Sequence, residues 1–311
     1  MQVHTGDTLE TEAKEMRRLG QHPLLLTFHG VARSEDSELH QVTELAPHGT
    51  LYDALHVLAD RPGTTAVSDI VLLTLAQQVR PRTSLSDSLN QKSELLGTEP
   101  SACLCPRACV RFVASWCANG AEPLTWRRWR RQVCEAMQFI ANKGVVHRDL
   151  AARNILLFAP LTAADPLSVD TKVSDFGLAR AAYSLQTTGA GAGPGLPVRY
   201  MSPEALRRNR FTEKSDVWAF GVLLWEVATL GEKPYFDTSR DDDVIRGVCG
   251  GKLRLPRPEG CSQKIFELMA SCWRDSPEHR PSFRELRRHI QSMMLELGAE
   301  GPVRHLRRVI C

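Results

Sequence analysis

Two acidic residues and an amide stand at positions that suit chemistry on phosphate groups. Asp149 and Asn154 belong to the segment HRDLAARN, which lies between the apolar pair Val145-Val146 and the apolar run ILL and is therefore expected to be a loop between two packed segments. Asp175 opens Asp175-Phe176-Gly177, directly after an expected short strand. Carboxylate and amide oxygens are ligands that Mg²⁺ accepts. The reaction that such loops suit is phosphoryl transfer from a metal-bound polyphosphate.

Both helices and strands are expected to position these loops. Helical spacing over Leu9 to Leu19 predicts an amphipathic helix, and LLLTFHGVA and LHQVTEL predict two short strands. A helix is expected after Gly49, and another is predicted by the spacing from Trp126 to Ile140. Short strands, loops and mostly helices follow to about Leu297. The pattern predicts an α+β protein whose second half is mainly helical.

Composition limits the class of protein. The chain has 311 residues, 42% of them hydrophobic, and 39 basic against 36 acidic side chains leave a formal charge of +3. This is ordinary globular composition, and its charge is too even to indicate a nucleic acid partner. No apolar run reaches the roughly 20 residues that a membrane-spanning helix needs, and no secretory signal opens the chain. Nine cysteines, most of them scattered, favour a cytoplasmic protein or the cytoplasmic part of a larger receptor.

Two segments fall outside the periodic pattern. Residues from about 59 to 122 are rich in Ser and Thr and poorly periodic, which predicts an inserted loop. Residues 298–311 form a short basic tail. We therefore expect one domain over residues 1–297, interrupted by the insertion and followed by the tail.

The order of the motifs resembles that of the eukaryotic protein kinases, and in particular the tyrosine kinases. HRDLAARN is followed by DFG, by Ser202-Pro203-Glu204 and by SDVWAFG, and later by CW with Pro277, Arg280 and Pro281. The resemblance runs from about Leu9 to Leu297. It implies the two-lobe kinase fold, with a partial N-lobe and a complete, mainly helical C-lobe.

The resemblance implies a set of catalytic and metal-binding roles, with ATP and Mg²⁺ as cofactors. Asp149 would accept the proton of the attacking hydroxyl, and Arg153 would supply a cation near the acceptor. Asn154 and Asp175 would hold the Mg²⁺ ions. The substrates would be tyrosine-containing proteins.

It also implies an adenine pocket. Thr43 would be the gatekeeper, the hinge backbone over Glu44, Leu45 and Ala46 would hydrogen-bond adenine, and Leu156 would form the floor. Glu12 matches the glutamate of the regulatory helix. Met16, Phe28, His147 and Phe176 would stack as an apolar column that couples this helix to the DFG loop.

Regulatory residues follow from the same resemblance. Phe176 and Gly177 complete DFG, and Arg280 would pair with Glu204. Arg148 would bind a phosphate on the activation loop. Tyr183 is the tyrosine between DFG and Pro197, so we expect autophosphorylation there, with an unmodified tyrosine as the alternative.

The expected preference for tyrosine over serine or threonine as the phosphate acceptor rests on fewer residues. Ala151 stands where serine/threonine kinases usually have lysine, and the sequence from Ala151 to Arg153 resembles the tyrosine kinase loop. PVRYMSPE also resembles the tyrosine kinase segment, with Tyr200 in place of tryptophan. Both features favour tyrosine, and a serine/threonine-specific kinase is the alternative.

One part of the resemblance is missing. The family has a glycine-rich loop and a strand lysine ahead of the regulatory helix, but the eleven residues before Glu12 hold one glycine and no lysine. We expect a piece of an active kinase that begins inside the domain. The alternative is a catalytically impaired pseudokinase that serves as a scaffold.

Overall fold

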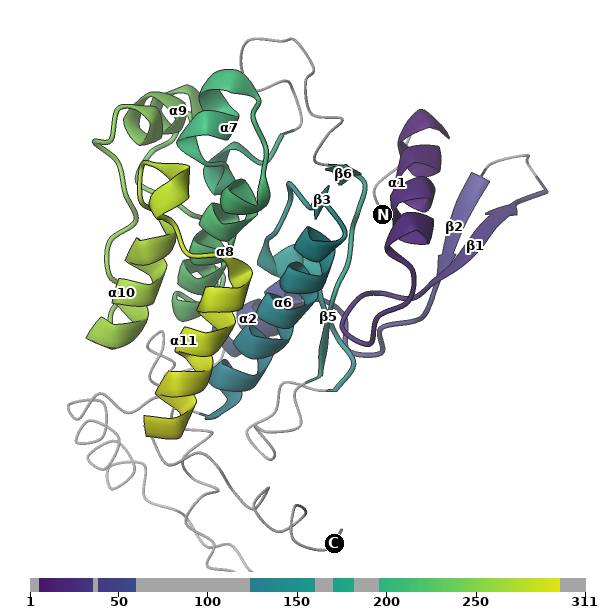
Figure 1. The fold of residues 1–311 in the computed structure, drawn as a ribbon, viewed down its shortest axis with the longest axis horizontal. Coiled ribbons are helices and arrows are strands. Elements are labelled where there is room, and N and C mark those ends of the chain that lie inside the picture. The colour runs from purple at the N-terminus through teal and green to yellow at the C-terminus, as the bar shows by residue number, and fades with distance from the viewer. Residues whose placement is uncertain (1–5, 36–38, 60–123, 160–169, 182–195, 297–311) are drawn as a thin grey trace, which may run out of the picture.

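The computed structural model describes residues 6–35, 39–59, 124–159, 170–181 and 196–296 (Figure 1). The predicted insertion, apart from Ala59, lies outside these residues, as do Tyr183 and the tail at 298–311. Predictions about those segments therefore stay predictions.

The N-terminal part consists of one helix and a two-stranded sheet. Helix α1 spans Gly6–Leu19, strand β1 spans Phe28–Arg33 and strand β2 spans Leu39–Thr43. The strands are antiparallel, with Phe28 opposite Thr43 and Arg33 opposite Leu39. The helix contacts both strands and buries Met16 and Leu19 (Figure 1). The predicted helix and strand pair are confirmed.

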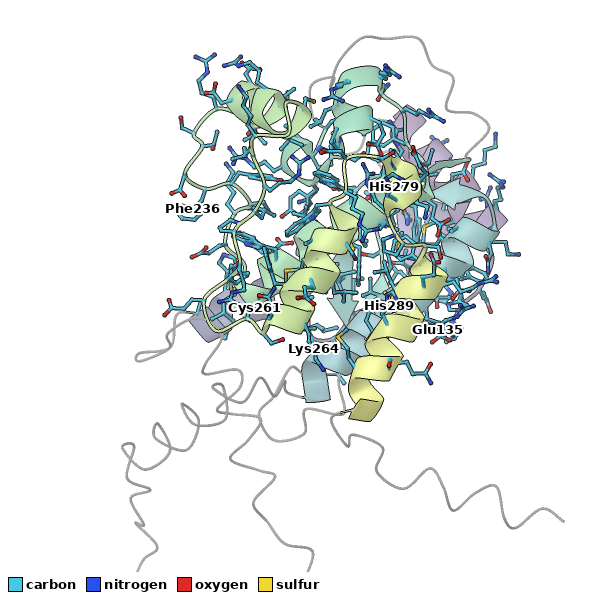
Figure 2. All side chains as sticks on the ribbon, turned by 60° about the vertical axis from the view of Figure 1, so that its left-hand side comes forward. Glu135, Phe236, Cys261, Lys264, His279 and His289 are labelled. Carbon is cyan, nitrogen blue, oxygen red and sulfur yellow. The ribbon has the colours of Figure 1, made fainter. Side chains whose placement is uncertain are left out.

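The rest of the described chain is mainly helical. Its helices are α2 (Leu51–Ala59), α6 (Leu124–Asn142), α7 (Pro203–Arg208), α8 (Glu213–Ala228), α9 (Asp241–Cys249), α10 (Gln263–Cys272) and α11 (Phe283–Glu296). Helix α8 is buried along nearly its whole length, and α10 packs against it. Helix α11 packs along α6, as the helices that carry His289 and Glu135 show in Figure 2.

Helix α8 has the features that a central buried helix needs. From Val217 to Ala228 its side chains are buried on all sides and, apart from Glu226, carry no charge, which is typical of a helix surrounded by protein. The Thr212 side chain accepts from the Lys214 backbone N–H, and the Ser215 hydroxyl oxygen accepts from the Thr212 backbone N–H, so a capping box fixes the start of the helix. Trp218 and Trp225 are each at most 2% exposed. Trp273, which follows α10, is 6% exposed, so these three tryptophans belong to the core.

Short strands hold the loops that carry the motifs. Strand β3 (Val145–Val146) pairs with β6 (Arg180–Ala181), and β4 (Ile155–Leu157) pairs with β5 (Thr171–Val173), both antiparallel. A 3₁₀ turn, Ala152–Asn154, lies between β3 and β4. The loop that contains Asp149 is therefore fixed by one strand before it and another after it.

The arrangement agrees with the predicted fold: a small N-terminal part of helix and sheet beside a large helical part, with the motif loops between them (Figure 1). None of the helices in the described ranges combines the length with the apolar character that a bilayer crossing requires.

Candidate active site

The Asp149 carboxylate is held from two sides within its own loop. Arg153 makes an ion pair with Asp149 Oδ1, and the Asn154 side-chain amide donates to Asp149 Oδ2 at 3.0 Å. The same amide nitrogen donates to the Asp149 backbone oxygen at 2.7 Å. Asp149 is 8% exposed. Its two oxygens are thus fixed in direction by a cation and an amide.

Strand pairing brings Asn154 and Asp175 to one place. Strands β4 and β5 pair Ile155 with Val173, so Asn154 lies opposite Ser174, one residue before Asp175. The Ser174 backbone N–H and hydroxyl both donate to the Asn154 carbonyl, at 2.9 and 3.1 Å. The two expected metal ligands, 21 positions apart in the sequence, therefore leave adjacent strand ends.

Asn154 has an orientation that suits a cation. The Asn154 side-chain nitrogen donates to two oxygen acceptors, so the amide turns its nitrogen to them and its oxygen to the opposite side. Asp175 adds a carboxylate, one oxygen of which accepts from the Gly177 backbone N–H at 3.1 Å. Within the described residues, no group of three or more His, Cys or acidic side chains could hold a metal. One amide and one carboxylate still fit Mg²⁺ on a nucleotide, because Mg²⁺ takes its other ligands from water and phosphate.

Asp216 on α8 anchors the backbone of the catalytic loop. Its two carboxylate oxygens accept from the backbone N–H groups of His147 (2.8 Å) and Arg148 (2.9 Å). Asp216 is 2% exposed. Burial raises the pKa of the Asp216 carboxyl to about 6, while nearby His147 and the two backbone donors act in the opposite direction. Asp216 therefore ties the backbone of the catalytic loop to α8.

His147 links the catalytic loop to the DFG segment. Its Nδ1 accepts from the Asp149 backbone N–H at 3.3 Å, so the ring carries its hydrogen on Nε2, which donates to the Ser174 carbonyl at 3.0 Å. The His147 and Phe176 rings lie 5.2 Å apart. Both side chains are buried. One imidazole therefore joins the segment of the expected base to that of the expected metal ligand.

Arg148 and Asp175 have left-handed backbone conformations. The φ angle is +73° at Arg148 and +61° at Asp175, a region that residues other than glycine seldom adopt. Such conformations persist where the surroundings fix them, and they concentrate at functional sites. Here Asp216 fixes Arg148 from the backbone side. The Arg148 guanidinium also lies over the Phe211 ring at 3.9 Å.

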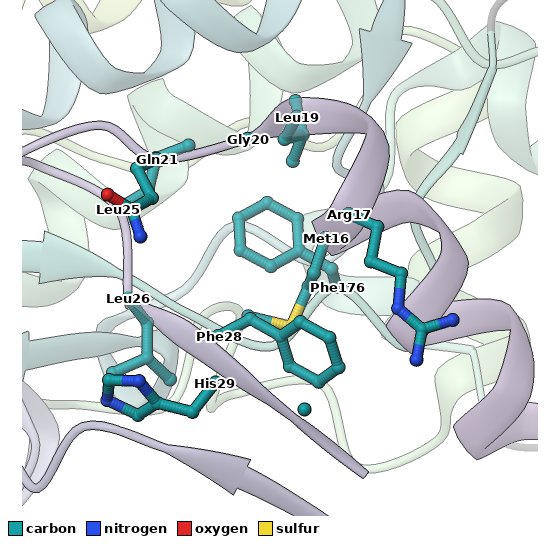
Figure 3. A pocket seen from close by; sticks show the side chains of 11 residues that line it. Met16, Arg17, Leu19, Gly20, Gln21, Leu25, Leu26, Phe28, His29 and Phe176 are labelled. Carbon is teal, nitrogen blue, oxygen red and sulfur yellow. The ribbon is translucent and has the colours of Figure 1, made fainter.

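Helix α1 meets the DFG loop directly. The Glu12 carboxylate accepts from the Phe176 backbone N–H at 3.3 Å, and Glu12 is 5% exposed. Met16 and Phe28 line, with Phe176, a cavity of about 330 Å³ between α1 and β1 (Figure 3). With His147 against Phe176, the four members of the expected apolar column lie together.

The expected hinge follows β2, and its glutamate, Glu44, contacts both Thr27 and Lys172. Glu44 exchanges backbone and side-chain contacts with Thr27: its N–H donates to the Thr27 carbonyl at 3.0 Å, and its carboxylate accepts from the Thr27 N–H at 2.7 Å. Lys172 on β5 lies 2.6 Å from the same carboxylate. Burial opposes ionisation of Glu44, but the hydrogen bonds from Lys172 and Thr27 outweigh it and lower the pKa.

The remaining hinge residues lie close to β4. Thr43 ends β2, Leu45 is 86% exposed and Ala46 follows it. The Gly49 carbonyl accepts from the Leu157 N–H at 2.9 Å, and Thr50 forms an isolated bridge with Leu156. The segment that follows the expected hinge therefore lies beside the strand that carries the expected floor residue, Leu156.

Glu204 and Arg280 form the pair that the sequence predicts. Arg280 Nη1 and Nη2 donate to the two oxygens of Glu204 at 2.7 and 2.9 Å. Arg280 also donates to the carbonyls of Arg274, Lys214 and Asp275, and it is 2% exposed. A bidentate guanidinium–carboxylate pair of this kind joins α7 to the segment before α11.

Two residues of this network have no sequence signal of their own. Glu226 on α8 accepts from the Ala152 backbone N–H at 2.9 Å and from the Tyr200 hydroxyl at 2.8 Å. Lys172 lies in the short strand Thr171–Val173, and nothing in the sequence indicates its partner. Their partners lie 74 and 128 positions away in the sequence. Only the fold could reveal them.

Comparison with known proteins identifies the family. Residues 2–290 match the family described as protein tyrosine and serine/threonine kinase. The transforming protein Abl, a tyrosine-protein kinase of Abelson murine leukemia virus, is 42% identical over 174 residues, which are 55% of this chain and 22% of that protein. The tyrosine-protein kinase receptor torso of Drosophila melanogaster is 43% identical over 168 residues, 53% of this chain and 17% of torso.

A further relative is named as inactive. The inactive tyrosine-protein kinase 7 of Gallus gallus is 44% identical over 158 residues, 50% of this chain and 14% of that protein. The chain thus spans less than a quarter of the length of each of these relatives. The family match covers most of the chain, and the relatives are of one type. The chain belongs to the protein tyrosine and serine/threonine kinase family, and it is a kinase domain of the tyrosine-kinase type.

Proposed function

We propose that this domain transfers the γ-phosphate of ATP to tyrosine hydroxyls of proteins, with Mg²⁺ as the metal. One observation carries the proposal: the Asp149 carboxylate, held by Arg153 and Asn154, stands on a loop that leads into the strand pair from which Asn154 and Asp175 emerge. A proton acceptor and two oxygen ligands for a metal are the groups that phosphoryl transfer requires.

Each side chain has a separate task in this proposal. Asp149 accepts the proton of the attacking tyrosine hydroxyl at its carboxylate. Arg153 pairs with that carboxylate and restricts its direction, and a carboxylate is the form of the group that can accept a proton. The Asn154 amide oxygen and the Asp175 carboxylate would hold Mg²⁺, which when bound neutralises charge on the phosphates. Positioning and charge stabilisation account for most of the rate gain in such a site.

The nucleotide base would lie between the hinge and β4. The backbone over Glu44 to Ala46 offers the hydrogen-bonding groups, Thr43 borders the pocket and Leu156 supplies an apolar surface beneath the ring. The ion pair between Glu44 and Lys172 supports this placement, because it fixes the hinge relative to the strand that leads to Asp175. Glu12 supports the site from α1 through the Phe176 N–H.

The proposal that tyrosine is the phosphate acceptor rests on the loop after Asp149. Ala151 and Ala152 are fully buried, and the next residue, Arg153, supplies the cation near the acceptor with its side chain 38% exposed. The test is phosphoamino-acid analysis of a mixed Tyr, Ser and Thr substrate pool incubated with the chain, ATP and Mg²⁺. Phosphotyrosine alone is the expected product. Phosphoserine or phosphothreonine as the main product would replace the proposal with the serine/threonine alternative.

A second function, a non-catalytic scaffold, is favoured by one comparison. The relative from Gallus gallus is named as inactive, and its 44% identity to this chain is similar to the 42% of the transforming protein Abl. Calorimetric titration with ATP, with and without Mg²⁺, separates the two functions. Binding that requires Mg²⁺ and is weakened by Asp175→Asn supports catalysis. A chain that binds no nucleotide at millimolar ATP supports the scaffold.

Regulation by phosphate is part of the proposal. Arg148 would bind a phosphate on Tyr183, which lies outside the described residues, and Phe176, Gly177 and the Glu204–Arg280 pair would transmit the ordered state to the site. Mass spectrometry of active protein tests this. Phosphate on Tyr183 is expected, and modification of Thr187 or Thr188 instead would exclude Tyr183.

Placement in the cell is a further part of the proposal. The scattered cysteines and the use of ATP fit a cytoplasmic domain, either on its own or as the cytoplasmic part of a receptor. One relative, torso, is named a receptor. Fractionation of cells that express the natural protein would test this placement.

A further inference from the structure

Glu226 joins two segments that border the expected acceptor site. One of its carboxylate oxygens accepts from the backbone N–H of Ala152, which lies in the catalytic loop. The other accepts from the hydroxyl of Tyr200, which ends the 3₁₀ turn Val198–Tyr200. Glu226 is 2% exposed, on the fully packed helix α8. A single buried carboxylate therefore fixes both segments to the centre of the domain.

Tyr200 also acts on the catalytic loop by a second route, which leads through Arg153 to Asp149. The Arg153 guanidinium lies over the Tyr200 ring at 5.2 Å, and the same guanidinium pairs with the Asp149 carboxylate. A cation over an aromatic face is attracted to it, so the ring restricts where Arg153 can point. Tyr200 thus acts on the catalytic loop through its hydroxyl and through its ring.

The hydroxyl matters because Glu226 is deeply buried. A buried carboxylate needs hydrogen-bond donors on both oxygens, and loss of one donor leaves the group partly unsatisfied. Burial already raises the pKa of Glu226, and it also raises that of Tyr200. Removal of the Tyr200 hydroxyl would favour reorientation or protonation of Glu226, and either change would weaken its bond to Ala152.

We propose that Tyr200 is a positioning residue for the acceptor side of the site: through Glu226 and Arg153 it fixes the catalytic loop where the tyrosine of the substrate must bind. The inference rests on the proposed function and adds a residue to it. Because the contacts reach Ala152 and Arg153 and not the hinge, the effect should fall on binding of the acceptor peptide and not on binding of ATP.

The first test needs no catalytic activity. Amide hydrogen exchange at Ala152 is measured in the full chain for wild type, for Tyr200→Phe and for Tyr235→Phe. Tyr200→Phe keeps the ring and removes the hydroxyl, so we expect exchange about tenfold faster at Ala152. Tyr235→Phe removes a hydroxyl from another buried tyrosine, 7% exposed, and should leave Ala152 unchanged.

The second test separates positioning from general damage. Tyr200→Phe should raise the KM for a tyrosine peptide about tenfold and leave the KM for ATP within about twofold of wild type. Glu226→Gln keeps the shape of the side chain and removes its charge. If Tyr200 acts through Glu226, then Tyr200→Phe should add much less to the peptide KM in the Glu226→Gln background than alone.

The outcomes distinguish this inference from the proposed function. If wild type transfers no phosphate, the proposed function fails, and the exchange at Ala152 alone decides the inference. Unchanged exchange in Tyr200→Phe overturns the inference whatever the activity. An equal rise in the KM for ATP and for peptide also overturns it, because that result indicates damage to the whole site.

Discussion

Arg280 illustrates how single buried residues hold the domain together. Its guanidinium satisfies Glu204 and three backbone carbonyls while being 2% exposed. Replacement by Met should lower the free energy of unfolding by about 3–5 kcal/mol, because it leaves Glu204 with an uncompensated charge. The measurement is urea unfolding followed by tryptophan fluorescence.

A matched control separates this effect from that of an ordinary ion pair. Arg246 pairs with Asp243 on the surface, with 71% and 44% of the two side chains exposed. Arg246→Met should cost no more than about 1 kcal/mol. Equal losses in the two variants would contradict the claim that Arg280 is a structural centre of the domain.

Asp216 should give the stability of the domain a pH dependence. Burial raises its pKa from 3.8 to about 6 in the folded state, so the folded chain holds this proton more tightly than the unfolded chain does. Its contribution to stability is complete below about pH 4, declines as the pH rises and is lost above about pH 6, a change of about 3 kcal/mol.

Comparison with Asp216→Asn isolates this group. The asparagine cannot titrate, so its cost is the same at every pH. The free energy of unfolding of wild type minus that of Asp216→Asn should decrease between pH 4 and pH 6 and stay constant from pH 6 to pH 8. A difference that rises with pH would mean that hydrogen bonding to His147 and Arg148 outweighs burial.

At the residue scale, motifs predicted the chemistry and the supporting Glu204–Arg280 pair, but not every residue that supports the site. Asp149, Asn154 and Asp175 were identified because their spacing is that of a known family. Glu226 and Lys172 were not, because each acts through a partner that is distant in the sequence. A glutamate in a buried, otherwise apolar helix needs hydrogen-bond donors, but the sequence does not say which groups supply them.

Among the elements, α8 is the one on which the others depend. Gly221 faces α10 so closely that an added Cβ would lie 2.6 Å from Trp273 Nε1 and 2.8 Å from Cys272 Cβ. Gly221→Ala should therefore lower the free energy of unfolding by about 1–3 kcal/mol despite the better helix propensity of alanine.

Gly250 provides the comparison for Gly221. Its φ of −75° suits any residue, and an added Cβ would make one tight contact, 3.0 Å from the Arg246 carbonyl oxygen, in place of the two shorter contacts at Gly221. Gly250→Ala should change the free energy of unfolding by less than about 1 kcal/mol. A Gly221→Ala variant as stable as wild type in the same urea titration would show that α10 moves away without cost.

Long periodic elements could be predicted, and short ones could not. The apolar spacing from Leu9 to Leu19 was sufficient for α1, and the start of α2 followed from Gly49. Strands β3 and β6 have two residues each and lie far apart in the sequence, so no periodicity can define them. Their pairing exists because tertiary packing brings Val145 and Ala181 together.

In the whole molecule, the N-terminal and helical parts are joined by backbone hydrogen bonds. The Leu26 N–H donates to the Val173 carbonyl at 2.9 Å, and the Val173 N–H donates to the Leu24 carbonyl at 3.0 Å. The Glu44–Lys172 pair reinforces the same junction. The segment before β1 is therefore hydrogen-bonded to the strand that leads to Asp175, which connects the expected hinge to the segment of an expected metal ligand.

The central claim is that Asp149 serves phosphoryl transfer at this junction. The most direct measurement is the rate of phosphate transfer from ATP to a tyrosine peptide by wild type, Asp149→Asn and Asp237→Asn, at equal concentrations of folded protein. Asp237 lies next to Phe236, which is 58% exposed on the loop before α9 (Figure 2), and it has no part in the proposed site.

We expect Asp149→Asn to lower the rate about 10²-fold to 10⁴-fold, because an amide cannot accept the tyrosine proton, and Asp237→Asn to match wild type. A wild-type rate no greater than that of Asp149→Asn would contradict the account.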